Sequence, residues 1–209
     1  MIPGVTTLKT ESNAPGGGRN SVRIIGGTWR GRRVSFPDMP GLRPTPDRVR
    51  ETLFNWLQHD VAGARCLDLF AGSGALGLEA LSRGAKELVF VEQAVPASRT
   101  LQDQLTRLGG ERKGRVAEMG AARYLRTPAD PFDIVFLDPP FGQDALAEYV
   151  PLLDAGHWLN SGGLVYLENE KAAGPPVLPA RWELLKSKSA GEVGYYLARV
   201  SSRGPEENA

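Results

Sequence analysis

Residues 67–77 read Leu67-Asp68-Leu69-Phe70-Ala71-Gly72-Ser73-Gly74-Ala75-Leu76-Gly77, and this stretch decides the fold class. An apolar run that contains one acid leads into a Gly-x-Gly-x-x-Gly loop, and helical periodicity follows over 74–83. Glycines permit a tight turn, and they let a ligand approach the backbone beside the N-terminus of a helix. The stretch therefore predicts a strand, a ligand-binding loop and a helix, which together form one unit of a parallel sheet.

The alternation of strands and helices continues outward from this loop. The predicted strands are 66–70, 87–92, 114–117, 132–138 and 163–168, and the predicted helices are 74–83, 96–108, 120–125 and 144–153. Such alternation requires crossover connections, so we expect an α/β fold with a mostly parallel sheet that is covered on both faces. Two further strands, 182–189 and 193–200, flank Ala190-Gly191 and predict an antiparallel edge.

The ends of the chain differ from this pattern. Two short strands at 22–25 and 32–36, with Gly26-Gly27 and Gly31 between them, predict a β-hairpin, which a Pro/Gly loop joins to a helix at 47–59. The predicted organisation is a disordered tail (1–18), an Arg-rich extension (19–60), a catalytic domain (61–200) and a second disordered tail (201–209).

Composition excludes several classes of protein. The chain has 209 residues and 41% hydrophobic residues, enough for a packed core, and it has no apolar run of the roughly 18 residues that cross a membrane. The N-terminus does not resemble a secretory signal. The one cysteine, Cys66, permits neither an internal disulfide nor a cysteine-based zinc site. We expect a cytoplasmic, metal-independent monomer that does not bind membranes.

The charge is unevenly distributed along the chain. The net charge is +1, but residues 19–50 hold eight arginines and two acids, a net charge of +6, so the rest of the chain carries −5. Such an asymmetry favours an anionic polymer as partner, because the arginine fork binds phosphates and base edges well. A solvated, charged extension is the alternative explanation. Arg48 and Arg50 begin the predicted helix, where the helix dipole disfavours cations, which suggests a role other than stability.

Glu92 indicates a nucleoside ligand. It closes the next strand twenty residues after Gly72, where a carboxylate can accept hydrogen bonds from a ribose diol. A dinucleotide-binding dehydrogenase and a site for S-adenosyl-L-methionine (SAM) both fit this pattern. Asp68 favours SAM, because a carboxylate within an apolar strand needs a partner and the amino group of SAM would supply one, whereas a pyrophosphate would be repelled.

Asp138-Pro139-Pro140-Phe141 follows the apolar strand that ends at Leu137. Ligands of open α/β sheets bind at the carboxyl ends of strands, and the two prolines remove N–H donors there. Carbonyl and carboxylate acceptors beside an aromatic ring suit a planar group with an exocyclic amine, whose lone pair they would aim at a methyl donor. An ordinary strand-terminating turn is the alternative. Glu168 and Glu170 could border this pocket, although solvated carboxylates are the simpler interpretation.

With these motifs in this order, residues 22–200 resemble the class I SAM-dependent methyltransferases that modify exocyclic amines, and more closely the bacterial 16S rRNA (guanine-N2)-methyltransferases of the RsmD type. The Arg-rich block is the most specific part of the resemblance. The matching stretches are Arg23-Ile24-Ile25-Gly26-Gly27, Arg30-Gly31-Arg32, Arg43–Leu57, Asp68–Ala80 and Gly191-Glu192-Val193-Gly194-Tyr195.

The resemblance implies a Rossmann-like fold with seven strands and a set of site residues. The implied SAM-binding residues are Asp68, Phe70, Ala71, Gly72, Ser73, Gly74, Gly77, Glu92, Gln93 and Met119. The implied catalytic residues, which would hold the target guanine, are Asp138, Pro139, Pro140 and Phe141. The expected RNA-binding residues are Arg30, Arg32, Arg33, Arg43, Thr45, Arg48 and Arg50. Gly120 departs from the family pattern, which has Asp or Asn beside the adenine amine.

The substrate implied is one guanine of 16S rRNA, in a partly assembled small-subunit particle. A base within a helix must leave the stack to be modified, and Phe141 is a candidate to stack on it. Three alternatives stay open: an amine methyltransferase that acts on DNA or on protein glutamine, a non-catalytic RNA-binding assembly factor with a SAM fold, and a nicotinamide dehydrogenase.

Overall fold

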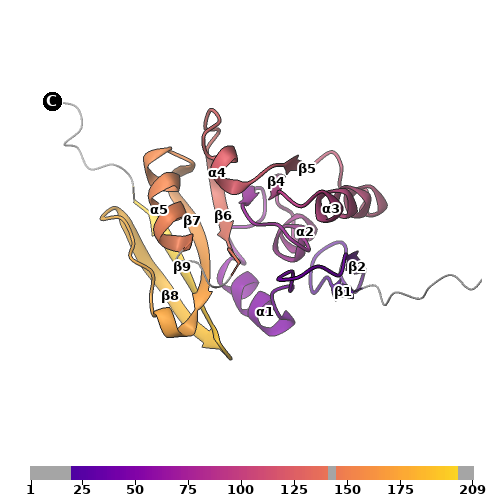
Figure 1. The fold of residues 1–209 in the computed structure, drawn as a ribbon, viewed down its shortest axis with the longest axis horizontal. Helices are drawn as coiled ribbons and strands as arrows, with labels where there is room; N and C mark the ends of the chain where they lie inside the picture. Colours follow the sequence, from indigo (N-terminus) through magenta and orange to yellow (C-terminus); the bar gives the residue numbers. More distant parts are fainter. Residues whose placement is uncertain (1–19, 141–144, 202–209) are drawn as a thin grey trace, which may run out of the picture.

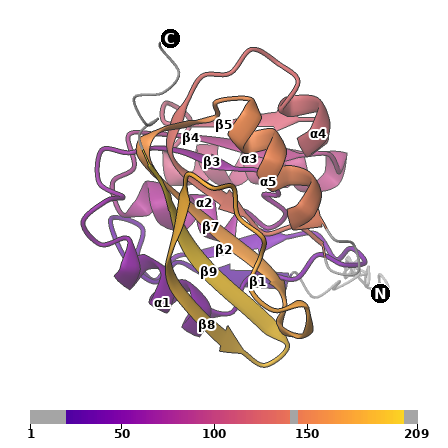
Figure 2. The same cartoon turned by 90° about the vertical axis from the view of Figure 1, so that its left-hand side faces the viewer.

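The computed structural model describes residues 20–140 and 145–201. In these ranges seven strands form one sheet in the order β5-β4-β3-β6-β7-β9-β8 (Figure 1). The strands are β3 (Arg65–Asp68), β4 (Glu87–Glu92), β5 (Gly114–Glu118), β6 (Phe132–Leu137), β7 (Leu159–Glu170), β8 (Trp182–Ala190) and β9 (Val193–Val200). β3 to β7 are parallel, and β9 is antiparallel to β7 and β8. The predicted fold class is confirmed, including the antiparallel edge, which faces the viewer in Figure 2.

Helices cover both faces of the sheet. The helices are α1 (Asp47–Trp56), α2 (Ala75–Ser82), α3 (Val95–Leu108), α4 (Ala121–Tyr124), α5 (Ala145–Ala155) and the short 3₁₀ helix η1 (Lys171–Ala173). Side chains of α1, α2 and α3 pack in one core and those of α4 and α5 in the other. Along β6, Ile134 and Phe136 join the first core while Val135 and Leu137 join the second, as the two-residue period of a strand requires.

The N-terminal hairpin forms a separate small sheet beside α3, far from β8 (Figure 1). β1 (Asn20–Arg23) pairs antiparallel with β2 (Arg33–Phe36), and Val22 lies opposite Val34. These two valines are buried in the first core, so the arginines next to them, Arg23 and Arg33, are turned to solvent on the other side of the hairpin. The predicted hairpin is therefore confirmed.

Two predicted boundaries differ from the structure by three residues or more. β7 begins at Leu159 instead of residue 163, because a register irregularity lets it pair with β6 on both sides of the turn-like residues 161–163. α1 ends at Trp56, three residues before the predicted end. Phe141 and the predicted tails, except residue 201, lie outside the described residues. Among the helices described, none is long and apolar enough to cross a membrane.

Candidate active site at the carboxyl edge of the sheet

Three acids meet at the carboxyl ends of neighbouring parallel strands. Asp68 ends β3, Asp138 directly follows β6, and Glu168 lies near the end of β7. β6 pairs with both β3 and β7, and neighbouring strands lie about 4.8 Å apart. The two-residue period turns all three side chains to the α1–α3 face. The topology therefore brings three carboxyl groups together at one edge of the sheet.

Asp68 is buried, and its carboxylate accepts a hydrogen bond from the Gly77 N–H at 3.1 Å. Burial, reinforced by the nearby charges of Asp138 and Glu92, raises the pKa of Asp68 to about 7. A carboxyl group in this situation is stabilised in its charged form by a cation. The edge of the sheet therefore suits a positively charged ligand.

The three glycines of the loop have different roles. At Gly74 (φ +75°) a Cβ would lie 2.4 Å from Leu101, and at Gly77 it would lie 2.2 Å from Phe90, so these two glycines permit close packing of α2. At Gly72 (φ +51°) a Cβ would meet no atom nearer than 3.9 Å. Of the three, Gly72 is therefore the position where the left-handed backbone borders open space that a ligand can occupy.

Glu92 holds this loop to the end of β4. One carboxylate oxygen accepts the Gly72 N–H at 2.8 Å, and the other accepts the Ala94 N–H at 2.7 Å. The predicted cofactor residue Gln93 lies close to Gly120, since a Cβ on Gly120 would be 3.2 Å from the Gln93 amide oxygen. Gln93 is exposed and Met119 is partly buried. The glycine at position 120 thus leaves space that the Gln93 side chain borders.

Aromatic packing supports the other side of the loop. Phe70 is partly buried and meets Tyr149 of α5 edge-to-face, with ring centroids 5.0 Å apart. Ala71 and Ser73 are buried within the loop itself. The described cofactor candidates therefore surround one region, between the end of β3 and the end of β4.

Asp138 accepts a hydrogen bond from a residue of the Arg-rich segment. The Thr45 hydroxyl donates to Oδ2 of Asp138 at 3.2 Å. Burial raises the pKa of Asp138 to about 6, and the Thr45 hydrogen bond opposes that rise. Pro139 is buried and Pro140 is exposed. Thr45 itself is buried, so it is part of the site around Asp138. The sequence pattern had predicted it as an RNA-binding residue together with the exposed arginines.

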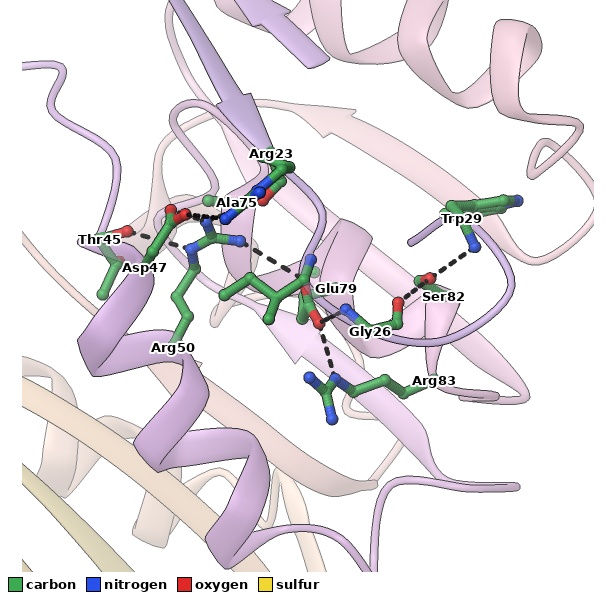
Figure 3. A network of polar contacts seen from close by, with 12 residues as sticks. Arg23, Gly26, Trp29, Thr45, Asp47, Arg50, Ala75, Glu79, Ser82 and Arg83 are labelled. Atoms are coloured by element: carbon green, nitrogen blue, oxygen red, sulfur yellow. Dashed lines mark hydrogen bonds and ion pairs between the residues drawn. The ribbon is translucent and has the colours of Figure 1, made fainter. Parts of the chain in front are cut away.

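Arg50 is a correction to the predicted RNA-binding set. Its side chain is 1% exposed and its guanidinium bonds Glu79, Asp47 and the carbonyl oxygens of Arg23 and Thr45 (Figure 3). A guanidinium enclosed by four partners cannot reach RNA. Ion pairing inside the fold therefore explains why Arg50 occupies the start of α1, where the helix dipole disfavours a cation.

Glu79 is the centre of the same network. Its carboxylate accepts the N–H groups of Ile25 and Gly26, each at 2.8 Å, and Nε of Arg83 at 2.7 Å, and it pairs with Arg50 (Figure 3). Ser82, one turn further along α2, accepts from the Trp29 N–H and donates to the Gly26 carbonyl. α2 therefore anchors the hairpin on the helix that follows the glycine loop.

The other predicted arginines, Arg30, Arg32, Arg33, Arg43 and Arg48, are exposed. A hollow of about 440 Å³ lies between the hairpin and the start of α1, with Arg23, Arg33, Pro44 and Thr45 among its lining residues. Thr45 lines this hollow and also bonds Asp138, so this one residue connects the hollow with the acidic edge of the sheet. In the described ranges, no cluster of three or more His, Cys, Asp or Glu residues could hold a metal ion.

Comparison with known proteins identifies the relatives of this chain. The family model described as "conserved hypothetical protein 95" matches residues 22–199. The chain belongs to this family. It is 46% identical over 190 residues to ribosomal RNA small subunit methyltransferase D of Escherichia coli strain K12, covering 91% of this chain and 96% of that protein. The resemblance inferred from the sequence motifs is therefore confirmed.

Solved structures of this family and beyond share the fold. The Escherichia coli protein yhhF superposes with a TM-score of 0.82 at 43% identity, covering 88% of this chain and all of that chain. The protein SMU.776, solved in complex with SAH, superposes with a TM-score of 0.60 at 19% identity, covering 81% of this chain and 54% of that chain. At that identity the likeness concerns the fold alone.

Proposed function

We propose that this protein transfers a methyl group from SAM to the exocyclic N2 amine of one guanine in 16S rRNA. The observation that carries the proposal is the hydrogen bond from Thr45 to Asp138, because it joins the Arg-rich segment to the amine motif. The relative in Escherichia coli is a small subunit rRNA methyltransferase, which supports the same substrate class. Action on rRNA would place the protein in the cytoplasm.

The residues at the sheet edge fit SAM, which carries a sulfonium and an ammonium group. Asp68 would pair with the ammonium, Gly72 would leave room at the loop, and Glu92 would bind the ribose diol. Gln93 and Met119 would lie beside the adenine, next to the space left by Gly120. SAM supplies the methyl group on a positively charged sulfur, whose leaving group is a neutral thioether.

The protein's task is then to orient the amine. The Asp138 carboxylate and the Pro139 carbonyl would accept the two N–H groups of the guanine amine and aim its lone pair at the methyl group. Asp138 would then accept the proton that the methylated amine loses. Because the electrophile is already charged, alignment contributes more than base strength. An Asp also suits guanine, which presents the N1–H donor beside its N2 amine.

The exposed arginines would hold the RNA. Arg23 and Arg33 lie directly opposite each other on the solvent side of the hairpin. Like charges in this position repel each other, and a phosphate between them would relieve that repulsion. We propose that the segment 19–60 binds the rRNA backbone, while Phe141 stacks on the guanine after it has left its helix.

SAM affinity should depend on pH through Asp68. Its pKa is about 7 without ligand, and the ammonium pairs with the ionised form, so affinity should fall up to tenfold per pH unit below about 7. Asp68→Asn should lower affinity by about tenfold at neutral pH and remove most of this dependence. Calorimetric titration of both proteins between about pH 5.5 and 7.5 measures this, and parallel pH curves for the two would contradict the assigned pairing.

Neutralising the hairpin arginines should weaken RNA binding without changing SAM affinity. The triple replacement of Arg30, Arg32 and Arg33 by Gln should lower the affinity for rRNA about 10–100-fold and reduce the slope of log affinity against log salt by about 2. Arg123→Gln with Arg126→Gln, two exposed arginines at α4, is the control. If the triple variant lost SAM affinity equally, the hairpin would serve the fold and not the RNA.

Mass mapping of 16S rRNA tests the proposed function in the cell. Cells that lack the protein should lose one N2-methylguanine, and the gene supplied in trans should restore it. An unchanged modification map would contradict the proposal.

A further inference from the structure

Glu168 differs from its sequence-based interpretation as a solvated carboxylate. The structure buries it to 3% exposure beside the proposed catalytic Asp138. We propose that Glu168 is a positioning residue: its neutral carboxyl group directs the Thr45 hydroxyl at Asp138 and so keeps the Asp138 carboxylate aimed at the target amine. This inference rests on the proposed function, because it assigns Asp138 the role of acceptor for that amine.

The register of the sheet brings the two acids together. Leu137 of β6 is paired with Leu167 of β7, so the next residues, Asp138 and Glu168, lie at the same level of adjacent parallel strands. They share one face because each follows a residue of the opposite core. The position of Glu168 beside Asp138 therefore follows from strand pairing, and does not depend on a loop.

Thr45 connects the two carboxyl groups. Its hydroxyl donates to Asp138 at 3.2 Å and also interacts with the carboxyl group of Glu168. A hydroxyl has one proton to donate, so two carboxylates would compete for it, whereas a protonated acid can donate to the hydroxyl oxygen. With Glu168 neutral, a directed chain runs from Glu168 through Thr45 to Asp138.

The surroundings of Glu168 favour its neutral form. The titratable groups that face it are Asp138 after β6, Tyr166 on its own strand and Tyr195, its partner on β9. Burial and the Asp138 charge raise the pKa of Glu168 well above its usual value, while the Tyr166 hydroxyl donates to it at 2.7 Å. Glu168 is buried whereas Asp138 is partly exposed, so burial favours the neutral form more strongly at Glu168 than at Asp138.

Turnover of Glu168 variants tests the role. Glu168→Ala should lower kcat about tenfold with little change in KM for SAM, and Glu168→Gln should restore most of that loss, because an amide is neutral and can donate to Thr45. The ratio of kcat for Glu168→Gln to wild type should rise toward alkaline pH, where the wild-type acid ionises. Since the substrate is the same, its own ionisation cancels in this ratio. A Gln variant as impaired as Ala, or a ratio independent of pH, would overturn the proposal.

Infrared spectroscopy of the full chain supplies a readout that needs no turnover. The proteins are compared in an Asp68→Asn background, because the pKa of Asp68 is about 7 and its own protonated form would contribute a band at neutral pH. In that background the chain with Glu168 should show the band of a buried protonated carboxyl group, which Glu168→Gln should remove and Glu170→Gln, an exposed carboxyl two residues along β7, should leave in place. A band that persists in Glu168→Gln, or that is missing from the Asp68→Asn protein itself, would contradict the neutral form. If the band behaves as expected but the wild-type protein methylates no rRNA, the proposed function is wrong while the protonation of Glu168 still holds.

Discussion

Asp138→Asn should lower kcat for rRNA methylation about 10³-fold while SAM affinity stays within about twofold of wild type. The amide has one acceptor oxygen where the carboxylate has two, and its NH₂ group would point at the guanine donors. The variant would also lose the negative charge that strengthens the hydrogen bond from the Thr45 hydroxyl, which donates to Asp138 at 3.2 Å. Single-turnover methylation at saturating SAM measures the chemical step directly.

The matched control is Asp133→Asn, the same change at the opposite end of β6. Asp133 accepts the Arg65 N–H at 2.8 Å and a hydrogen bond from Asn160, far from the carboxyl edge of the sheet. We expect this variant to keep wild-type turnover. Guanine methylation by Asp138→Asn at near wild-type rates would show that bidentate acceptance by Asp138 is not needed.

The second large effect concerns the stability of the fold. Glu79→Ala should lower the free energy of unfolding by about 3–5 kcal/mol, because it leaves the buried Arg50 guanidinium with one acidic partner and removes the acceptor of two backbone N–H groups. For a chain of this size that corresponds to a Tm lower by about 10 °C. Thermal and urea unfolding of the purified protein measure the loss.

Glu87→Ala is the control for this change. Glu87 also pairs with two arginines, Arg65 and Arg115, but its side chain is 35% exposed. Solvent-exposed ion pairs contribute about 1 kcal/mol or less, so this variant should be close to wild type. Equal losses in the two variants would show that the buried network around Glu79 does not anchor the hairpin.

The architecture was predictable because it depends on periodicity. The apolar runs at 66–70 and 132–138, which alternate with segments of helical spacing, predicted the parallel sheet, and the paired strands around Ala190-Gly191 predicted its antiparallel edge. Asp68, Glu92 and Asp138 were identifiable because each interrupts or ends an apolar strand. These features are local, so the sequence displays them directly.

The contacts that join distant segments could not be predicted in the same way. Arg50 and Arg48 look alike in sequence, yet one is buried against Glu79 and the other is exposed. Glu168 ends an apolar strand as Asp138 does, and that shared signal could have marked it as buried. What the sequence does not contain is the register that sets β7 beside β6 and the path that brings Thr45 to both acids.

The most direct test is nucleoside mass analysis of rRNA methylated by the purified protein. Small-subunit particles and naked 16S rRNA from cells that lack the protein would be incubated with methyl-labelled SAM and then digested to nucleosides. We expect about one label per 16S molecule, all of it in N2-methylguanosine, and none with Asp138→Ala. Label in another nucleoside, or wild-type protein that transfers no methyl group to either substrate, would contradict the proposed function.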